Sequence, residues 1–501
     1  MNVAEAILRP GEDAAAAIRV RGDARRAQIG RGELRRTVRQ AAAALARLGV
    51  QEEQRVLVAL PDGPEAVTAV LGTMWNGSVP VLVSSFLPAD AYAAFLDESR
   101  ARALVTTRAL AEALRGRGTP ALTVEGDGSG SFRDALAREP ASAEPFPAHD
   151  DDPALWLYSS GTTGRPKGVV HLHRGVRHVI ETYGAQVLGT RPDDVVYATS
   201  KLFFAYGLGA SLWFPLGAGA TTVLAPDPFA PARTWRILAE ERPTVFFSVP
   251  SAYRALLEHA PPDAPAALVG VRLLVSAGEA LPERLFLAWR ERFGVEILDG
   301  LGSTEALHVF LSARPGACRA GTVGRPVPGY DVEIVDERGV PVALGTPGAL
   351  RVHGDSVAAG YWQRREATAR AFGGGWFTTG DQAVQDPDGA FRVLGRTDDM
   401  LKVSGQWVSP LDVEAVVSAV DGVRECGVVG AAGDGGLTEV VACVVSDEAE
   451  DAVRARIAAA CECLPRHKRP RRVVLVEALP RTPTGKLQRF ALRAAIVAMT
   501  R

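Results

Sequence analysis

Hydrophobic and polar positions alternate with two different periods along the first 110 residues. Apolar residues from Leu34 to Leu48 recur at three- and four-residue spacing, which predicts a helix that ends at Gly49. The apolar run 55–60 predicts a buried strand, and Pro64 opens a second helix. The same patterns predict strands at 79–83 and 103–107 and a helix at 88–99. Strands that alternate with helices indicate parallel sheets with helices on both faces.

The pattern changes twice further along the chain. Residues 124–153 are rich in Gly, Ser, Asp and Pro, which predicts an irregular connection. The alternation then resumes, with strands predicted at 221–224, 245–248 and 273–276 and helices at 231–241 and from 251. From about Val323, short apolar runs are separated by Gly and Pro, at 332–335, 349–352 and 391–394. This pattern of short apolar runs indicates a β-rich subdomain.

The length of the chain predicts more than one domain. It has 501 residues, and a single hydrophobic core stops growing below that size. A new unit of roughly a hundred residues begins at Asp398. We therefore predict an α/β protein in two domains. Residues 1–397 form a large N-terminal domain of helix-flanked sheets with the β-rich subdomain, and residues 398–501 form a small, mobile C-terminal α/β domain.

Composition excludes several classes of partner. The net charge is −2, so there is no electrostatic case for binding nucleic acid or an anionic membrane. The chain starts without a basic region followed by an apolar core, and no apolar run is long enough to span a bilayer. Five cysteines without a C-x-x-C pair argue against a disulfide framework and a structural zinc site. We expect a cytoplasmic protein, a monomer or a homodimer, without nucleic-acid or membrane partners.

The segment YSSGTTGRPKG, residues 158–168, is the most informative motif. The apolar run 155–157 precedes it and has strand character. Glycines and small hydroxyl residues expose many backbone N–H groups, which is a way to hold a polyphosphate. The segment lacks the Gly-x4-Gly-Lys-Ser/Thr spacing of a Walker loop. Taken alone, it is equally typical of a flexible Gly/Ser surface loop.

Four further motifs follow in order. They are GSTE at 302–305, TGD at 379–381, GRTDD at 395–399 and PTGK at 483–486. With them, the segment 158–168 resembles the phosphate-binding signature of the adenylate-forming superfamily of acyl- and aryl-CoA ligases, peptide-synthetase adenylation domains and luciferases. Three stretches resemble benzoate–CoA ligases within it: KLFFAYGLG (201–209), GSTEALHVFLS (302–312) and DDMLKVSGQWVSP (398–410).

This resemblance implies an ATP-dependent aryl-CoA ligase, an acid–thiol ligase that uses ATP, Mg²⁺ and CoA. The carboxylate of a benzoate-type acid, with benzoate or 2-aminobenzoate favoured, attacks the α-phosphorus and releases pyrophosphate. CoA then displaces AMP from the aryl-AMP. The first step brings two anions together, so the protein has to provide positive charge and fixed geometry.

The resemblance also implies roles for individual residues. Lys486, Thr304 and Glu305 are the catalytic candidates: Lys486 reaches the α-phosphate and the carboxylate, Thr304 contacts the α-phosphate, and Glu305 helps to hold Mg²⁺. Asp381 and Arg396 fix the ribose. The complete nucleotide-binding set implied is Ser159, Ser160, Gly161, Thr162, Thr163, Gly164, Lys167, Ser276, Gly278, Glu279, Asp299, Gly300, Gly302, Ser303, Asp381 and Arg396.

Two further sets follow from the same resemblance. Aromatic and small residues suit a flat ring, and the implied acid pocket is Ala205, Tyr206, Gly207, Leu301, Leu307 and His308. The neighbouring Phe203 and Phe204 are more typical of an ordinary core. Asp398 matches a hinge about which the small domain rotates between adenylation and thioester formation. The loop residues Lys402, Ser404 and Gly405 would then face CoA.

Two other functions remain open. A stand-alone adenylation enzyme would load the aryl acid onto the phosphopantetheine of a carrier protein by the same chemistry. A catalytically inactive nucleotide-binding regulator is the non-enzymatic alternative. The presence of every catalytic candidate argues against the regulator, because decay would remove at least one of them.

Overall fold

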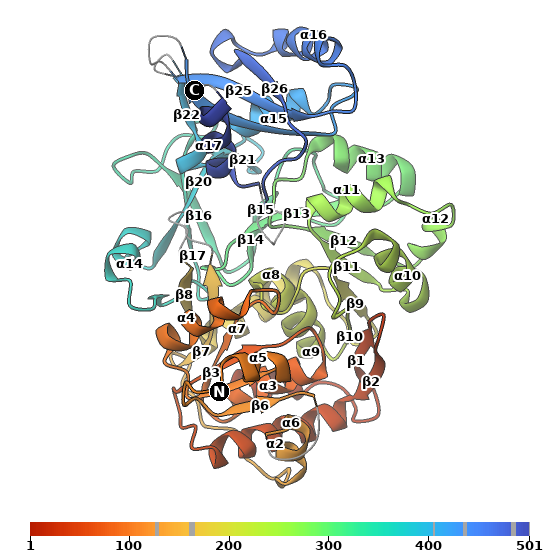
Figure 1. The fold of residues 1–501 in the computed structure, drawn as a ribbon, viewed down its shortest axis with the longest axis vertical. Helices are drawn as coiled ribbons and strands as arrows, with labels where there is room; N and C mark the ends of the chain where they lie inside the picture. Colours follow the sequence, from red (N-terminus) through yellow and green to blue (C-terminus); the bar gives the residue numbers. More distant parts are fainter. Residues whose placement is uncertain (126–129, 160–165, 404–405, 434–437, 482–486, 500–501) are drawn as a thin grey trace.

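The computed structural model describes residues 1–125, 130–159, 166–403, 406–433, 438–481 and 487–499. Figure 1 shows a large body that contains the N-terminus and a smaller domain at the opposite end of the long axis, where the chain ends. The body contains two large mixed sheets and one antiparallel sheet. The fold is therefore the predicted α/β arrangement of a large N-terminal part and a C-terminal domain.

The first large sheet has seven strands. Its order is β18 (Gly360–Tyr361), β8 (Lys167–Leu172), β7 (Pro153–Ser159), β4 (Val79–Leu82), β3 (Arg55–Ala59), β5 (Ala103–Thr106) and β6 (Ala121–Thr123). Neighbours from β7 to β6 are parallel, while β8 and β18 are antiparallel at one edge. Strands β4 and β5 are buried along their whole length, as expected when helices cover both faces.

Three of the predicted helices accompany this sheet. They are α2 (Arg31–Arg47), α3 (Pro64–Trp75) and α4 (Ala89–Ser99). Helix α3 is buried except at Glu65, because it packs between α2 and the sheet. Gly49 follows α2 with a φ of +77°, a conformation that glycine adopts without a steric penalty. The strands and helices predicted in the first 110 residues are confirmed.

The second large sheet has nine strands. Its order is β15 (Arg325–Pro326), β14 (Val309–Ser312), β13 (Ile297–Gly302), β12 (Leu273–Ser276), β11 (Val245–Ser248), β9 (Val195–Ala198), β10 (Thr221–Leu224), β1 (Ala16–Arg21) and β2 (Arg26–Gly30). Its associated helices include α8 (Ala205–Leu208), α9 (Phe214–Ala218), α10 (Pro231–Glu241), α11 (Pro250–Glu258), α12 (Ala264–Ala267) and α13 (Glu283–Phe293). Helix α7 (His173–Val179) instead contacts β7 and β8 of the seven-stranded sheet. The nine-stranded sheet is parallel from β1 to β13 and antiparallel at both edges.

The β-rich subdomain and the C-terminal domain follow as predicted. The antiparallel subdomain contains β16 (Asp331–Val335), β17 (Gly348–His353), β19 (Phe372–Gly373), β20 (Trp376–Gln385) and β21 (Phe391–Arg396), with α14 (Arg365–Ala371) beside it. The C-terminal domain contains the hairpin β22 (Leu401–Val403) and β23 (Gln406–Val408), and the sheet β24 (Glu425–Ala432), β25 (Thr438–Val445) and β26 (Arg472–Leu475). Its helices are α15 (Pro410–Val417), α16 (Glu450–Ala460) and α17 (Arg489–Met499). This domain has a hydrophobic core of its own.

Two details differ from the sequence predictions. The segment 124–153 is not irregular throughout, because it contains helix α6 (Phe132–Ala137). Ser131 caps that helix through its side chain, and Phe132 and Leu136 bury the same helical face four residues apart. The predicted parallel sheets are also mixed, because each large sheet has antiparallel strands at an edge.

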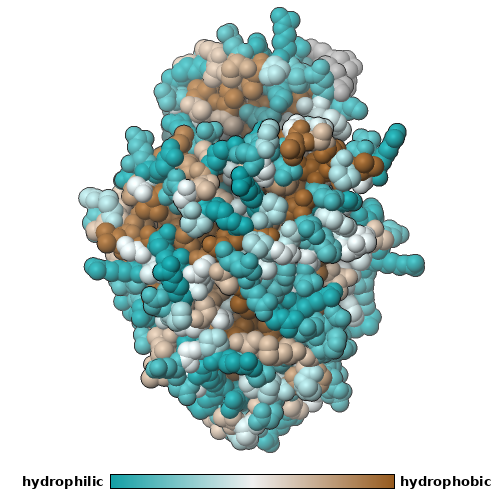
Figure 2. Space-filling model, turned by 180° about the vertical axis from the view of Figure 1, so that it is seen from behind, coloured by the Kyte–Doolittle hydropathy of each residue, from teal (hydrophilic) through white to brown (hydrophobic). Residues whose placement is uncertain are grey.

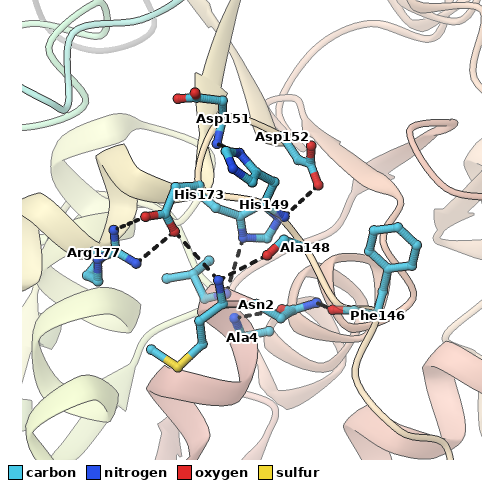
Figure 3. A network of polar contacts seen from close by, with 12 residues as sticks. Asn2, Ala4, Phe146, Ala148, His149, Asp151, Asp152, His173 and Arg177 are labelled. Atoms are coloured by element: carbon cyan, nitrogen blue, oxygen red, sulfur yellow. Dashed lines mark hydrogen bonds and ion pairs between the residues drawn. The ribbon is translucent and has the colours of Figure 1, made fainter.

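A partly buried polar network joins the first helix, α1 (Val3–Leu8), to residues 146–152, which precede β7, and to α7. Figure 3 shows it: Asn2 donates to the carbonyl of Phe146, and the N–H of Val3 donates to Nδ1 of His173 at 3.2 Å. Arg177 donates to both carboxylate oxygens of Asp150, at 2.9 and 2.6 Å. Burial lowers the pKa of His173 to about 4. His173 is therefore neutral at pH 7, which matches its role as an acceptor at Nδ1.

Replacing His173 by glutamine is expected to make the free energy of unfolding less sensitive to pH. Between pH 6.5 and about 4 the unfolded chain binds a proton at His173 that the folded chain excludes, so acidification destabilises the wild type. The stability advantage of the wild type over the variant then shrinks by up to about 1.4 kcal/mol per pH unit as pH falls. Urea unfolding at pH 7 and pH 5 measures this. Substitution of the exposed His353 serves as the control, and equal pH slopes for both variants would contradict the prediction.

Three further features concern membrane-spanning helices, cysteines and the polarity of the surface. No helix in the described ranges is long and apolar enough to cross a membrane. All five cysteines are free thiols. Figure 2 shows that polar side chains cover most of the rear face, and that apolar ones show mainly in its upper half, on the C-terminal domain and just below it.

Candidate active site

The candidate phosphate loop connects β7 to β8. Ser159, the last residue of β7, is opposite Lys167, the first residue of β8, in an antiparallel register. Strands β7 and β8 are thus an antiparallel pair near one edge of the seven-stranded sheet, where only the short strand β18 lies outside β8. Its members Ser160, Gly161, Thr162, Thr163 and Gly164 lie outside the described residues.

The turn that follows β13 presents Ser303, Thr304 and Glu305. The N–H of Leu307 donates to the carbonyl of Thr304 at 3.1 Å, and the N–H of Ala306 donates to the Ser303 hydroxyl at 3.1 Å. Leu307 is fully buried with a φ of +65°, a conformation that non-glycine residues seldom adopt. Such strain persists only where packing holds it in place, and it is common at functional sites.

Glu305 and Lys167 are brought together by one aromatic residue. The Tyr361 hydroxyl donates to Oε1 of Glu305 at 2.9 Å. The ammonium group of Lys167 lies 4.8 Å from the centroid of the same ring. Burial, and then the Glu305 carboxylate, raise the pKa of Tyr361 above its usual range, so the phenol keeps its proton. Tyr361 was not predicted as a site residue, because a lone tyrosine carries no motif that would identify it.

The two predicted ribose residues face each other across a pair of strands. Asp381 on β20 is opposite Arg396 on β21, and Nη1 of Arg396 lies 3.2 Å from Oδ1 of Asp381. The same nitrogen donates to the carbonyl of Thr379 at 2.8 Å. Gly380 has a φ of +76°, and a Cβ there would lie 2.8 Å from Nη2 of Arg396. Glycine at this position therefore allows the guanidinium to lie against the backbone.

Asp299 of β13 lies opposite Ser276, the last residue of the neighbouring parallel strand β12. Burial raises the pKa of Asp299 to about 8, and this effect outweighs the lowering by Ser276 and by the backbone N–H groups of Gly300 and Leu281. Asp299 is therefore largely a neutral acid at pH 7. The two carboxylate oxygens of Glu279 accept from the N–H and the hydroxyl of Ser251, both at 3.0 Å. Gly278 precedes it with a φ of +90°.

The predicted acid-pocket residues Tyr206 and His308 are in direct contact. Their rings stack with centroids 5.4 Å apart, and Nε2 of His308 lies 3.2 Å from the carbonyl of Tyr206. Since a carbonyl only accepts, Nε2 carries the proton and Nδ1 is an acceptor. Nδ1 is buried without a hydrogen-bond partner among the described residues. Burial lowers the pKa of His308 to about 3, so the ring is neutral.

The backbone around this ring pair is tightly packed. A Cβ on Gly207 would lie 2.1 Å from the carbonyl oxygen of Lys201, and one on Gly209 would lie 2.3 Å from the His308 ring. Tyr183 also packs on His308, with centroids 5.3 Å apart. Tyr183 and Gly209 belong to π-helical segments, Ile180–Val187 and Gly209–Trp213, a geometry common at functional sites.

The remaining pocket residues lie nearby. Ala205, Tyr206 and Gly207 form the start of α8, while Gly300, Leu301 and Gly302 end β13. Phe203 and Phe204 pack edge-to-face, and Phe203 is buried, which agrees with the core interpretation. Tyr183 was not predicted as a pocket residue. It lies 125 residues before His308 in the chain, and no motif near it indicates that the two rings are in contact.

The candidate hinge and CoA residues lie at the start of the C-terminal domain. Asp398 is in the 3₁₀ turn Thr397–Asp399. Lys402 lies on β22 with its ammonium group 5.5 Å from the ring of Trp407, which is 57% exposed. Ser404, Gly405 and Lys486 lie outside the described residues. Arg489, shortly after Lys486, is partly buried and donates to both oxygens of Glu414.

The described residues fit a magnesium ion bound mainly by a nucleotide. They contain no group of three or more His, Cys, Asp or Glu side chains that could hold a metal. Mg²⁺ is usually held by one or two carboxylates together with phosphate oxygens and water. Glu305, which contacts the same Tyr361 side chain as Lys167, is a carboxylate of that kind.

Known proteins match the chain over nearly its whole length. Residues 5–362 match the family model of AMP-binding enzymes, and residues 412–486 match the model of the AMP-binding enzyme C-terminal domain. A benzoate–CoA ligase of Thauera aromatica is 41% identical over 460 residues, which cover 89% of this chain and 87% of the relative.

Solved structures agree with these matches. A benzoate CoA ligase from Burkholderia xenovorans LB400 superimposes with a TM-score of 0.90 at 38% identity, over 98% of this chain and 100% of the other. The anthranilate CoA ligase AuaEII in complex with anthranoyl-AMP gives a TM-score of 0.93 at 34% identity, over 100% and 98%. This chain therefore belongs to the AMP-binding enzymes, the adenylate-forming superfamily.

Proposed function

We propose that the protein is an ATP-dependent aryl-CoA ligase that activates a benzoate-type acid to aryl-AMP and transfers the aryl group to CoA. The relatives that match about nine-tenths of the chain include a benzoate–CoA ligase and an anthranilate–CoA ligase. The observation that supports the proposal most is that the candidate magnesium site and the candidate acid pocket both lie close to β13. The turn with Glu305 follows this strand, and the Tyr206–His308 ring pair lies beside it.

Different residues would bind different parts of the nucleotide. Lys167 and the candidate phosphate loop would hold the β- and γ-phosphates, while Asp381 and Arg396 would hold the ribose. Thr304 would contact the α-phosphate. These contacts would bring the α-phosphorus close to the acid carboxylate and replace its water shell with fixed donors.

Magnesium would be held by Glu305 and the nucleotide phosphates, and it would supply positive charge where two anions meet. Lys486 would add a second positive charge at the reacting carboxylate. No side chain is needed as a base in this step, because the nucleophile is already a carboxylate at neutral pH.

The second half-reaction would follow a rotation of the C-terminal domain about Asp398. In the described residues, polar contacts between the domains include Arg284 with the carbonyl of Ser418 at 3.3 Å and Arg254 with the carbonyl of Arg424 at 3.4 Å. These two contacts are long and exposed, so they add little resistance to rotation. Close to the hinge, the hydroxyl of the buried Ser409 donates to the carbonyl of Leu394, and rotation would have to accommodate or break this hydrogen bond. Rotation would withdraw Lys486 and present the Lys402 hairpin to CoA.

Pyrophosphate release with a panel of acids tests the proposal. Benzoate, aminobenzoates and hydroxybenzoates are expected to support release with ATP and Mg²⁺, and octanoate is expected to be poor. Adding CoA is expected to give the aryl thioester, and a carrier-protein phosphopantetheine provides the comparison for the acceptor. Absence of release with any aryl acid would contradict the proposal, and equal or better turnover with octanoate would contradict the aryl assignment.

Replacing His308 by alanine is expected to change the ranking of ring-substituted acids more than the requirement for ATP. If His308 lines the pocket, Nδ1 accepts a hydrogen bond from a ring amino or hydroxyl group. The variant then loses about tenfold in kcat/KM for such acids relative to benzoate. Measuring kcat/KM for benzoate, 2-aminobenzoate and hydroxybenzoates in both proteins provides the test. An unchanged ranking would remove His308 from the pocket.

A further inference from the structure

Tyr361 connects the two charged groups that the proposed reaction requires. It is the last residue of the short strand β18, at the edge of the seven-stranded sheet. Its hydroxyl donates to Oε1 of Glu305 at 2.9 Å, and the face of its ring lies 4.8 Å from the ammonium group of Lys167. One side chain thus contacts a carboxylate from the β13 turn and a cation from the candidate phosphate hairpin.

The surrounding structure fixes the position of Tyr361. Its backbone pairs with Val169 in the antiparallel β18–β8 register. Its N–H donates to the hydroxyl of Thr368 at 3.0 Å, and its ring packs edge-to-face on Phe372 with centroids 5.3 Å apart. The phenol is therefore held by neighbours on several sides before any ligand binds.

The turn that carries Glu305 is attached to the same segment of chain. The N–H of Ala358 donates to the carbonyl of Glu305 at 2.8 Å, and the Ser356 hydroxyl donates to the carbonyl of Ala306 at 2.7 Å. The segment 356–361 thus holds both the backbone of the Glu305 turn and its carboxylate. A carboxylate held at one oxygen has fewer orientations to lose when it binds a metal.

We propose that Tyr361 is a positioning residue for the magnesium–nucleotide site, which sets the orientation of Glu305 through its hydroxyl and that of Lys167 through its ring. This assignment rests on the proposed function. Carboxylates that bind metals are usually hydrogen-bonded in turn, and removal of such a partner lowers metal affinity by about 10–100-fold. The hydroxyl of Tyr361 has this relation to Glu305, while a cation over an aromatic face gains a smaller, separate stabilisation.

The test measures binding of α,β-methylene-ATP by calorimetry while Mg²⁺ is titrated, and again in EDTA. Tyr361→Phe keeps the ring for Lys167 and removes only the hydroxyl. We expect it to raise the half-saturating Mg²⁺ concentration about tenfold or more, and to change affinity in EDTA less than twofold. Tyr361→Leu removes the ring as well, and we expect it to weaken binding in EDTA by about two- to fivefold.

Two further proteins separate positioning from a general structural effect. Tyr92→Phe removes a buried hydroxyl that donates to the carbonyl of Ser84, remote from Glu305 in the chain, and is expected to leave the Mg²⁺ dependence unchanged. Adding Tyr361→Phe to a Glu305→Gln variant is expected to cause little further loss, because the hydroxyl acts through that carboxylate.

Each outcome decides the assignment. A wild-type Mg²⁺ dependence in Tyr361→Phe overturns it, as does an equal loss of affinity with Mg²⁺ and in EDTA. Additive losses in the double variant overturn the route through Glu305. A wild-type protein that binds no magnesium–nucleotide overturns the proposed function and this assignment together. Thermal melting of every variant confirms folding, and Tyr361→Phe decides alone if Tyr361→Leu does not fold.

Discussion

Replacing Lys486 by alanine is expected to lower the rate of aryl-AMP formation by two or more orders of magnitude. The carboxylate and the α-phosphate are both anions, and their repulsion is largest in the transition state of adenylation. A positive charge held there in advance lowers that barrier more than it strengthens ground-state binding. Aryl-acid-dependent pyrophosphate release measures the effect.

The second half-reaction distinguishes this role from a loss of folding. Thioester formation from supplied aryl-AMP and CoA is expected to survive largely intact in Lys486→Ala. Lys468→Ala is the matched control: it removes another lysine of the C-terminal domain, one that forms an ion pair with Asp412 at 2.6 Å. An equal fall in both half-reactions of Lys486→Ala would show that the assigned role is wrong.

Replacing Asp398 by proline is expected to impair one half-reaction far more than the other. The pyrrolidine ring fixes φ and removes a rotation that the 3₁₀ turn Thr397–Asp399 would use when the C-terminal domain changes orientation. One orientation is then favoured, and the reaction that needs the other becomes slow. Separate assays of pyrophosphate release and of thioester formation from aryl-AMP measure the two effects.

A proline at a turn outside the hinge controls for the substitution itself. Glu337 is the second residue of an exposed turn in which the N–H of Gly339 donates to the carbonyl of Asp336 at 3.0 Å, and proline is favoured at that place. Glu337→Pro is expected to leave both half-reactions near the wild-type rate. Equal, mild effects of Asp398→Pro on both reactions would contradict the two-orientation account for this chain.

The secondary structure could be predicted closely because its signals are local. The strands predicted at 221–224, 245–248 and 273–276 and the helix at 231–241 have the bounds predicted for them. Buried parallel strands are continuous apolar runs bounded by polar residues, so a short window of sequence is enough to define them. Helix α6 was missed because its six residues contain only one pair of apolar residues at helical spacing, within a Gly- and Pro-rich stretch.

The candidate site was predicted only where a motif marked it. Lys167, Glu305, Asp381 and Arg396 belong to ordered motifs, and the structure brings Lys167 and Glu305 onto Tyr361 and pairs Asp381 with Arg396. The resemblance places Glu279 at the nucleotide site, and this stays a prediction; its contact with Ser251, 28 residues earlier, has no sequence signal.

By itself, the sequence determined the element types, the α/β class and the superfamily, because periodicity and motif spacing are properties of neighbouring residues. Only the tertiary structure decided that β8 and β18 are antiparallel at a sheet edge, that His308 stacks on Tyr206, and that Tyr361 reaches both Glu305 and Lys167. These contacts join residues separated by about a hundred positions or more, or by a change of sheet. They depend on strand order and register, which packing of the whole core fixes and no local window of sequence contains.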